Sequence, residues 1–114
     1  ETSLKKGELI EVVEFQVPDK SCYVKFPNPA SRYAIVGVYV AKYKNEVTVA
    51  VTGAESVAFR CEKIESALKS NFSSSAIDKV EISSSGFNSD NHASANYRAH
   101  LIKVLAKRAV AGCK

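Results

Sequence analysis

The sequence predicts an α+β fold, an antiparallel β-sheet of three to four strands followed by about three helices packed on one face. Apolar residues alternate or run continuously in the first half of the chain, and from Cys61 onward they recur at helical spacing. The connections between the strand-like runs are short, which predicts antiparallel pairs, because parallel strands need long crossovers. A run of strands followed by a run of helices is typical of an α+β layer fold.

Four stretches are predicted to be strands. Glu8 to Val17 alternates in part between apolar and polar side chains, so we expect a half-buried strand. Ser21 to Phe26 alternates in the same way. Tyr33 to Ala41 carries no charge and is rich in Val and Ile, which predicts a strand buried on both faces. A two-residue connection joins its end region to Val47–Val51, which indicates an antiparallel hairpin.

Helical patterns follow in the second half of the chain. Apolar residues three and four apart predict a helix over roughly Glu62 to Ser70. A short helix over about Ser75 to Val80 is expected after a serine-rich cap region. Ser83 to Asn91 is rich in Ser, Asn, Asp and Gly and is expected to be a loop. Ala93 to Ala111 gives the clearest helical pattern, with Gly112 as its stop.

The last predicted helix places a cation within its apolar stripe. The stripe is formed by Tyr97, Leu101, Val104 and Leu105. At about 100° per residue, Arg108 projects between these side chains. Its guanidinium must therefore extend past the edge of the core or meet an acceptor. The pattern leaves open whether Arg108 is structural or part of an interface.

The net charge of +4 is concentrated in the last segment. From Ser94 onward there are five cations and no acid, whereas the first 93 residues carry eleven cations and twelve acids. Nucleic acid, an acidic protein partner or a solvated helix face would each explain this surplus. The basic segment is expected to have no interleaved exposed aromatic side chains, and it has no RNP-like or KH-like motif, so nucleic acid is not expected as a partner.

The length of 114 residues is sufficient for one domain with a real core. No apolar run reaches the roughly 18 residues that a membrane span needs, and no signal peptide is visible. The three cysteines, Cys22, Cys61 and Cys113, lack CxxC spacing, which argues against a disulfide framework and a zinc site. Free thiols predict a cytoplasmic setting. The chain has no methionine, even at position 1, which indicates a piece of a longer protein.

The sequence contains none of the common motifs of a self-sufficient active site. It has no GxGxxG and no GxxxxGK[ST], so no phosphate-binding loop is predicted. No HExxH and no Ser-His-Asp signature occur. His92 and His100 lack partners at metal-ligand spacing and are expected to be exposed. The residue types therefore predict a binding or supporting module.

Three stretches resemble a known family in their order along the chain. They are GELI at Gly7–Ile10, KFPNPASRYAIVGVYVA at Lys25–Ala41 and DNHASANYRAHLIKVLAKRAV at Asp90–Val110. Together they resemble the C-terminal domain of the FAD-binding medium subunit of carbon monoxide dehydrogenase, in the molybdenum hydroxylase and xanthine dehydrogenase flavoprotein family. The chain departs from the family pattern at Asn96, where Glu is common, and at Arg32, where a small or acidic residue is frequent.

The resemblance implies that residues 1–114 are a single C-terminal domain of a flavoprotein subunit, without the upstream domains whose glycine-rich loops hold the FAD phosphates. FAD would be shared with those domains, and this chain alone is expected neither to bind it tightly nor to be catalytic. The implied partners are the upstream FAD-binding domains, an iron–sulfur subunit with [2Fe–2S] clusters and a subunit with the molybdenum cofactor. The alternative is a standalone interaction or dimerisation module that uses the basic C-terminal helix.

The resemblance also implies two cofactor-binding residues, Lys25 and Tyr23. Lys25 matches the family's lysine in the Y-x-K-F position, which lies near the flavin. An ammonium there would stabilise the negative charge of reduced flavin and raise its reduction potential. Tyr23 lies on the same strand face and would flank the ring. Without the resemblance, Lys25 would be interpreted as a solvated strand lysine. Arg98 is expected to anchor its helix to the sheet or to the upstream domain.

Overall fold

The computed structural model describes residues 2–114 and confirms the predicted α+β fold. Its sheet has four antiparallel strands in the order β1-β2-β3-β4. Their bounds are β1 Lys20–Pro27, β2 Ala34–Lys42, β3 Val47–Thr52 and β4 Phe59–Arg60. Neighbouring strands in the sheet are neighbours in sequence, so each pair is joined by a short connection.

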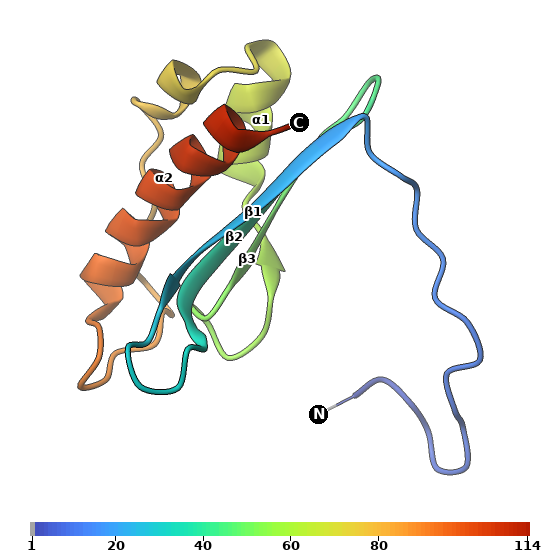
Figure 1. Cartoon of the computed structure of the whole chain (residues 1–114). Coiled ribbons are helices and arrows are strands. Elements are labelled where there is room, and N and C mark those ends of the chain that lie inside the picture. The colour runs from blue at the N-terminus through green and yellow to red at the C-terminus, as the bar shows by residue number, and fades with distance from the viewer. Residues whose placement is uncertain (1) are drawn as a thin grey trace.

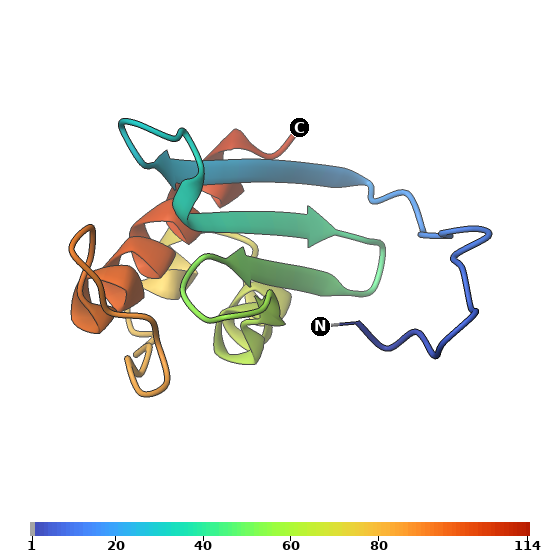
Figure 2. The same cartoon turned by 90° about the horizontal axis from the view of Figure 1, so that it is seen from below.

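The helices follow the strands and cover one face of the sheet. They are α1 Glu62–Ser70, the 3₁₀ turn η1 Ser74–Ile77 and α2 Ala95–Gly112. Figure 1 shows the helical layer on one side of the sheet, and Figure 2 shows the sheet with α2 behind it. Two α-helices therefore form where about three were predicted. The expected helix over Ser75–Val80 is a single 3₁₀ turn that buries Ile77, and Ser83–Asn91 is a loop as predicted.

The core lies between the sheet and the helical layer. Alternate residues of β2 point into it, and Val36, Val38 and Val40 are fully buried. The odd-numbered residues of β2 lie on the other face, which no helix covers among residues 2–114. The helices contribute fully or almost fully buried apolar side chains to the core: Ile64, Leu68, Ile102, Leu105, Ala106 and Ala109. None of the helices in the described chain is long and apolar enough to cross a membrane.

Helix α1 is fixed to the sheet by one carboxylate. Oε1 of Glu65 accepts from the backbone N–H of Val49 in β3 at 2.8 Å and from Nε of Arg60 in β4 at 2.9 Å. Oε2 of Glu65 accepts from Nη2 of Arg60 at 2.9 Å, so the arginine is held in a bidentate pair. This arrangement raises the pKa of Arg60 and joins the short edge strand to α1.

The predicted stripe of α2 is confirmed at Leu101 and Leu105 and is wrong at Tyr97 and Val104, which are not buried. Arg108 is exposed, and Tyr97 is 42% exposed, whereas Arg98 is buried among the apolar residues. The observed buried face is formed by Arg98, Ala99, Leu101, Ile102, Leu105, Ala106, Ala109 and Val110. The buried face lies about one position away from Tyr97 and Val104, so that Arg98, Ile102 and Ala106 face the sheet in their place.

The predicted strand over Glu8 to Val17 is also wrong in this structure. These residues are extended but form no ladder, and Val13, Phe15 and Val17 are more than 70% exposed. In Figure 1 the segment leaves the start of β1 and runs out on the side away from the helices. Alternation gives a strand its two faces, but a strand also needs a neighbouring edge, and the described chain provides none that takes this segment.

Candidate functional site

The two residues expected near a flavin, Tyr23 and Lys25, lie together on the uncovered face of the sheet. Cys22, Val24 and Phe26 pack against the core, so alternation turns Tyr23 and Lys25 outward. Both side chains are exposed, Tyr23 at 50%. The structure thus brings the two predicted residues together, and we call this pair the Tyr23–Lys25 surface.

The Tyr23 ring lies across the sheet because Gly37 leaves room for it. In the ladder, Tyr23 is opposite Tyr39 and Lys25 is opposite Gly37. A Cβ at Gly37 would lie 2.9 Å from Cε2 of Tyr23 and 2.7 Å from Oγ1 of Thr52. Any side chain at position 37 would therefore push the ring off the strand. The glycine, predicted only as part of a core strand, is what leaves room for the Tyr23 ring over position 37.

The ammonium group of Lys25 is held by the loop that connects β1 to β2. Its Nζ donates to the backbone carbonyl of Arg32 at 3.0 Å. Arg32 has a φ of 64°, the only positive value at a non-glycine residue in the described chain. An ammonium has three N–H groups, so this bond orients Lys25 and leaves two donors for another acceptor.

Asn28 builds the same loop. Its Oδ1 accepts from the backbone N–H groups of Ala30 at 2.9 Å and Ser31 at 3.2 Å. Its backbone N–H donates to the carbonyl of Tyr33 at 2.7 Å, and its own carbonyl accepts from the N–H of Arg32 at 2.9 Å. Four bonds to one residue fix the loop despite its two prolines, which supply no N–H.

Arg98 is a buried charged residue that connects α2 to the sheet through hydrogen bonds. Its Nη1 donates to the carbonyl of Ile35 at 2.6 Å and to the carbonyl of Gly53 at 2.9 Å. Its Nη2 donates to Oδ2 of Asp90 at 2.7 Å. The side chain is only 4% exposed, and its Nε is buried without a hydrogen-bond partner among the described residues. The expectation that Arg98 anchors its helix to the sheet is confirmed.

Asp90 completes this ion pair and was missed in the sequence. Its Oδ1 accepts from the backbone N–H groups of His92 at 2.9 Å and Ala93 at 3.0 Å. These bonds and the nearby Arg98 lower the pKa of the Asp90 carboxyl, although its burial opposes the shift. An aspartate a few residues before the Ser94 helix cap is a recognisable signal for such a turn, and Ser94 does accept from the N–H of Tyr97 at 3.2 Å.

Because the pKa of Asp90 is lowered in the folded protein, the free energy of unfolding decreases at acidic pH. The folded-state pKa lies below the ordinary value of 3.8, so the stabilisation is complete above that value and is lost as the pH falls through the folded pKa. We expect the thermal midpoint of Asp90→Asn to fall less steeply than that of the wild type between about pH 4.5 and pH 2.5. Parallel slopes in calorimetry would show that Asp90 does not carry this acid sensitivity.

A polar cavity of about 250 Å³ lies beside Arg98 at this end of the sheet. Two of the three stretches that carry the family resemblance line it, Lys25–Ala41 through Asn28, Ser31 and Tyr33, and Asp90–Val110 through Asp90, His92 and Arg98. His92 belongs to no group of three or more potential metal ligands among residues 2–114. The positive charge of Arg98 is already balanced by Asp90, so the cavity is polar without a free charge.

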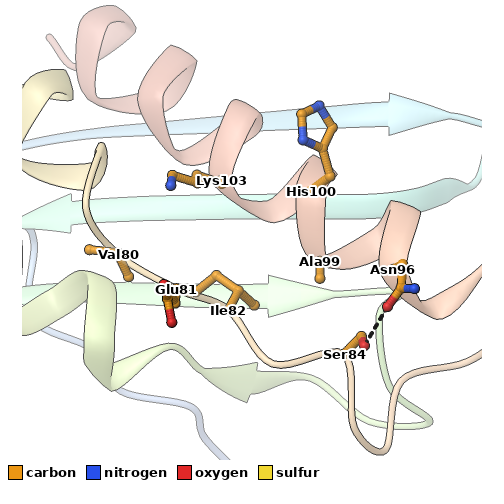
Figure 3. A pocket seen from close by; sticks show the side chains of 8 residues that line it. All are labelled: Val80, Glu81, Ile82, Ser84, Asn96, Ala99, His100 and Lys103. Atoms are coloured by element: carbon orange, nitrogen blue, oxygen red, sulfur yellow. Dashed lines mark hydrogen bonds between the residues drawn. The ribbon is translucent and has the colours of Figure 1, made fainter.

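A larger groove of about 390 Å³ lies between α2 and the extended segment before the loop. Figure 3 shows Val80 and Ile82 on the segment and Ala99 on the helix, with the bond of 2.6 Å from Ser84 Oγ to Asn96 Oδ1 at one end. His100 and Glu81 point in opposite directions in this view. No hydrogen bond or ion pair among the described residues joins Glu81, His100 and Lys103, the titratable groups that line this groove.

The cations of α2 are largely used within the domain. Nζ of Lys103 donates to the backbone carbonyl of Asp78 at 2.7 Å, and Lys107 forms an ion pair with the carboxylate of Asp78. Lys107 first, and Lys103 to a smaller extent, lower the pKa of Asp78. With Arg98 buried, Arg108 is the exposed arginine of the helix. The charge surplus predicted a basic helix face, but most of that charge has a partner.

In comparisons with known proteins, no family model, no curated protein and no solved structure matches this chain.

Proposed function

We propose that this chain is the C-terminal domain of the FAD-binding medium subunit of a carbon monoxide dehydrogenase-like molybdenum hydroxylase. In that role it covers the flavin and helps to dock the subunits while electrons pass from [2Fe–2S] clusters to FAD. The observation that carries the proposal is the Tyr23–Lys25 surface. An aromatic ring and an ammonium lie side by side on the uncovered sheet face, each held in place by a specific feature.

The chemistry of this surface fits one part of FAD. The Tyr23 ring offers a flat apolar area for the isoalloxazine, and Lys25 keeps two N–H donors for oxygen or nitrogen atoms at the pyrimidine end. The surface does not fit the phosphates, because the five glycines are isolated and form no phosphate-binding loop. The FAD phosphates are accordingly assigned to the upstream domains.

FAD, when bound, supplies the electron acceptor of the proposed reaction. Lys25 would stabilise negative charge on the ring system after reduction, because an ammonium in a poorly hydrated interface interacts strongly with a nearby anion. Tyr23 would hold the ring plane against the sheet and exclude water from it. The free thiols Cys22, Cys61 and Cys113 agree with a reducing cytoplasm as the site of the complex.

The alternative, a standalone module that binds partners through a basic helix, is less well supported. It depends on the free charge of α2, and Arg98, Lys103 and Lys107 are engaged within the domain. The remaining exposed cations would give a weak, salt-dependent attraction. The proposed function therefore rests on the uncovered face of the sheet and not on the helix.

Replacing Lys25 by methionine in the subunit with its upstream domains tests the proposal. We expect the flavin midpoint potential to fall by about 30 mV or more, which corresponds to about 1.4 kcal/mol for a two-electron couple. The potential is measured by spectroelectrochemical titration, and FAD content is measured after denaturation. The fold should persist, because the bond from Lys25 to Arg32 is at the surface.

Lys25→Arg and Lys44→Met serve as matched controls. Lys25→Arg keeps the cation and should keep most of the potential. Lys44 is an exposed lysine in the β2–β3 turn, at the other end of the sheet, so Lys44→Met should change neither potential nor FAD content. Equal potentials for Lys25→Met and the wild type would mean that Lys25 only supports the loop.

A further inference from the structure

Two cysteines far apart in the sequence meet at the edge of the sheet. Cys22 lies in β1, and Cys113 follows the last residue of α2. A Cβ at Gly112 would lie 3.0 Å from Sγ of Cys22, so the end of the helix touches that sulfur. Sγ of Cys113 lies 3.9 Å from the carbonyl oxygen of Val40, and Val40 is the cross-strand partner of Cys22. Both sulfurs therefore lie close to the Cys22–Val40 pair of the β1–β2 ladder.

The backbone holds the two segments together at this place. The N–H of Ser21 donates to the carbonyl oxygen of Lys114 at 3.3 Å, which fixes the residues on either side of the two cysteines. Cys113 itself has extended backbone angles, φ −61° and ψ 123°, outside the helix. Rotation at Cys113, which lies outside the helix, and about the two side chains is the movement that would bring the sulfurs to bonding distance.

Both thiols can be reached by a reagent, whereas the third cannot. Cys22 and Cys113 are partly exposed, and Cys61 is buried. Partial burial raises the pKa of the Cys113 thiol, and the neighbouring Cys22 raises it further, while Lys20 opposes the shift. Because the thiolate is the attacking species, the raised pKa of Cys113 means that its reaction with a disulfide becomes faster as the pH rises.

We propose that Cys22 and Cys113 are an oxidation-sensitive pair that forms an intrachain disulfide with glutathione disulfide as the oxidant. One protein thiolate attacks a glutathione sulfur, forming a mixed disulfide and releasing one glutathione thiolate. The second protein thiolate then attacks the protein sulfur of that mixed disulfide and releases the other glutathione. The two protein sulfurs are oxidised, glutathione disulfide is reduced to two glutathione molecules, and these take up the two thiol protons.

The bond would join the end of α2 to the edge strand β1. It would close a ring that includes almost the whole domain, and a long ring removes the most conformational freedom from the unfolded chain. The oxidised domain is therefore expected to melt at a higher temperature than the reduced one. The site is independent of the Tyr23–Lys25 surface, so it can be tested whether or not the domain contacts a flavin.

The test treats the full chain with glutathione disulfide at neutral and at mildly alkaline pH, then alkylates the remaining thiols for mass spectrometry. We expect a monomer that has lost two of its three thiol hydrogens and a proteolytic peptide pair joined through Cys22 and Cys113. The bond should form faster at the higher pH, and the thermal midpoint should rise and return to its starting value with dithiothreitol. Cys61→Ser should behave like the wild type.

Two variants supply the matched controls. Cys22→Ser and Cys113→Ser should each stop at the mixed disulfide with glutathione and show no gain in thermal midpoint. The proposal is overturned if the wild type also stops at the mixed disulfide, if its peptide map joins Cys61, or if the only disulfides link two chains.

Discussion

Replacing Arg98 by methionine is expected to lower the free energy of unfolding by about 3–5 kcal/mol, the largest loss for any polar residue of the domain. The substitution keeps most of the aliphatic volume but removes three hydrogen bonds at once. The carbonyls of Ile35 and Gly53 lose a donor, and Asp90 loses its counter-ion. Urea unfolding followed by circular dichroism measures the loss.

Arg108→Met is the control for this prediction, because Arg108 lies on the same helix and is exposed. Its effect should stay within about 0.5 kcal/mol. A loss below about 1 kcal/mol for Arg98→Met would contradict the assigned role, since it would mean that water from the neighbouring cavity replaces the guanidinium. The pair of variants also separates the observed buried face of α2 from the one predicted by sequence.

Replacing Gly53 by alanine is expected to cost about 2–4 kcal/mol, through backbone strain and crowding together. Gly53 has a φ of 81°, which L side chains rarely adopt. A Cβ there would also lie 2.5 Å from the carbonyl oxygen of Ile35 and 2.8 Å from that of Ala34. Because the Ile35 carbonyl accepts from Arg98, moving it would weaken that bond as well.

Gly86→Ala separates the two causes. Gly86 has a φ of 83°, close to that of Gly53, but a Cβ there would meet no atom within 4 Å. Its substitution should therefore cost only the strain, about 1–2 kcal/mol. The difference between the two variants in urea unfolding measures the crowding at Gly53. Equal losses of unfolding free energy for Gly53→Ala and Gly86→Ala would show that the backbone at Ala34 and Ile35 moves away from the added methyl group without cost.

Much of the fold could be predicted because its signals are local. The helix over Glu62–Ser70 has the predicted bounds. Strand β2, Ala34–Lys42, begins and ends one residue later than the predicted uncharged run Tyr33–Ala41. In both elements the spacing of the apolar residues predicts which side of the element is buried. The sheet order follows from short connections, which leave antiparallel neighbours as the simplest arrangement.

The errors arise where distant contacts decide the outcome. Arg98 is buried because two carbonyls and Asp90 receive its donors, and helical spacing alone cannot reveal such acceptors. Position 37 is a glycine because a tyrosine from another strand lies over it. The predicted pair Lys25 and Tyr23 was placed together correctly, since two residues apart on a strand share a face. The hydrogen bond from Lys25 to the carbonyl of Arg32 depends on a loop conformation that no sequence pattern predicts.

The extended segment from Glu8 to Val17 has a consequence for the behaviour of this domain in concentrated solution. Its apolar side chains and unpaired backbone form a ready template for strand pairing between molecules. Glu8, Glu11 and Glu14 interrupt it at intervals of three residues, and their like charges oppose stacking of identical copies. Salt screens this repulsion, so colloidal stability should be best at low ionic strength.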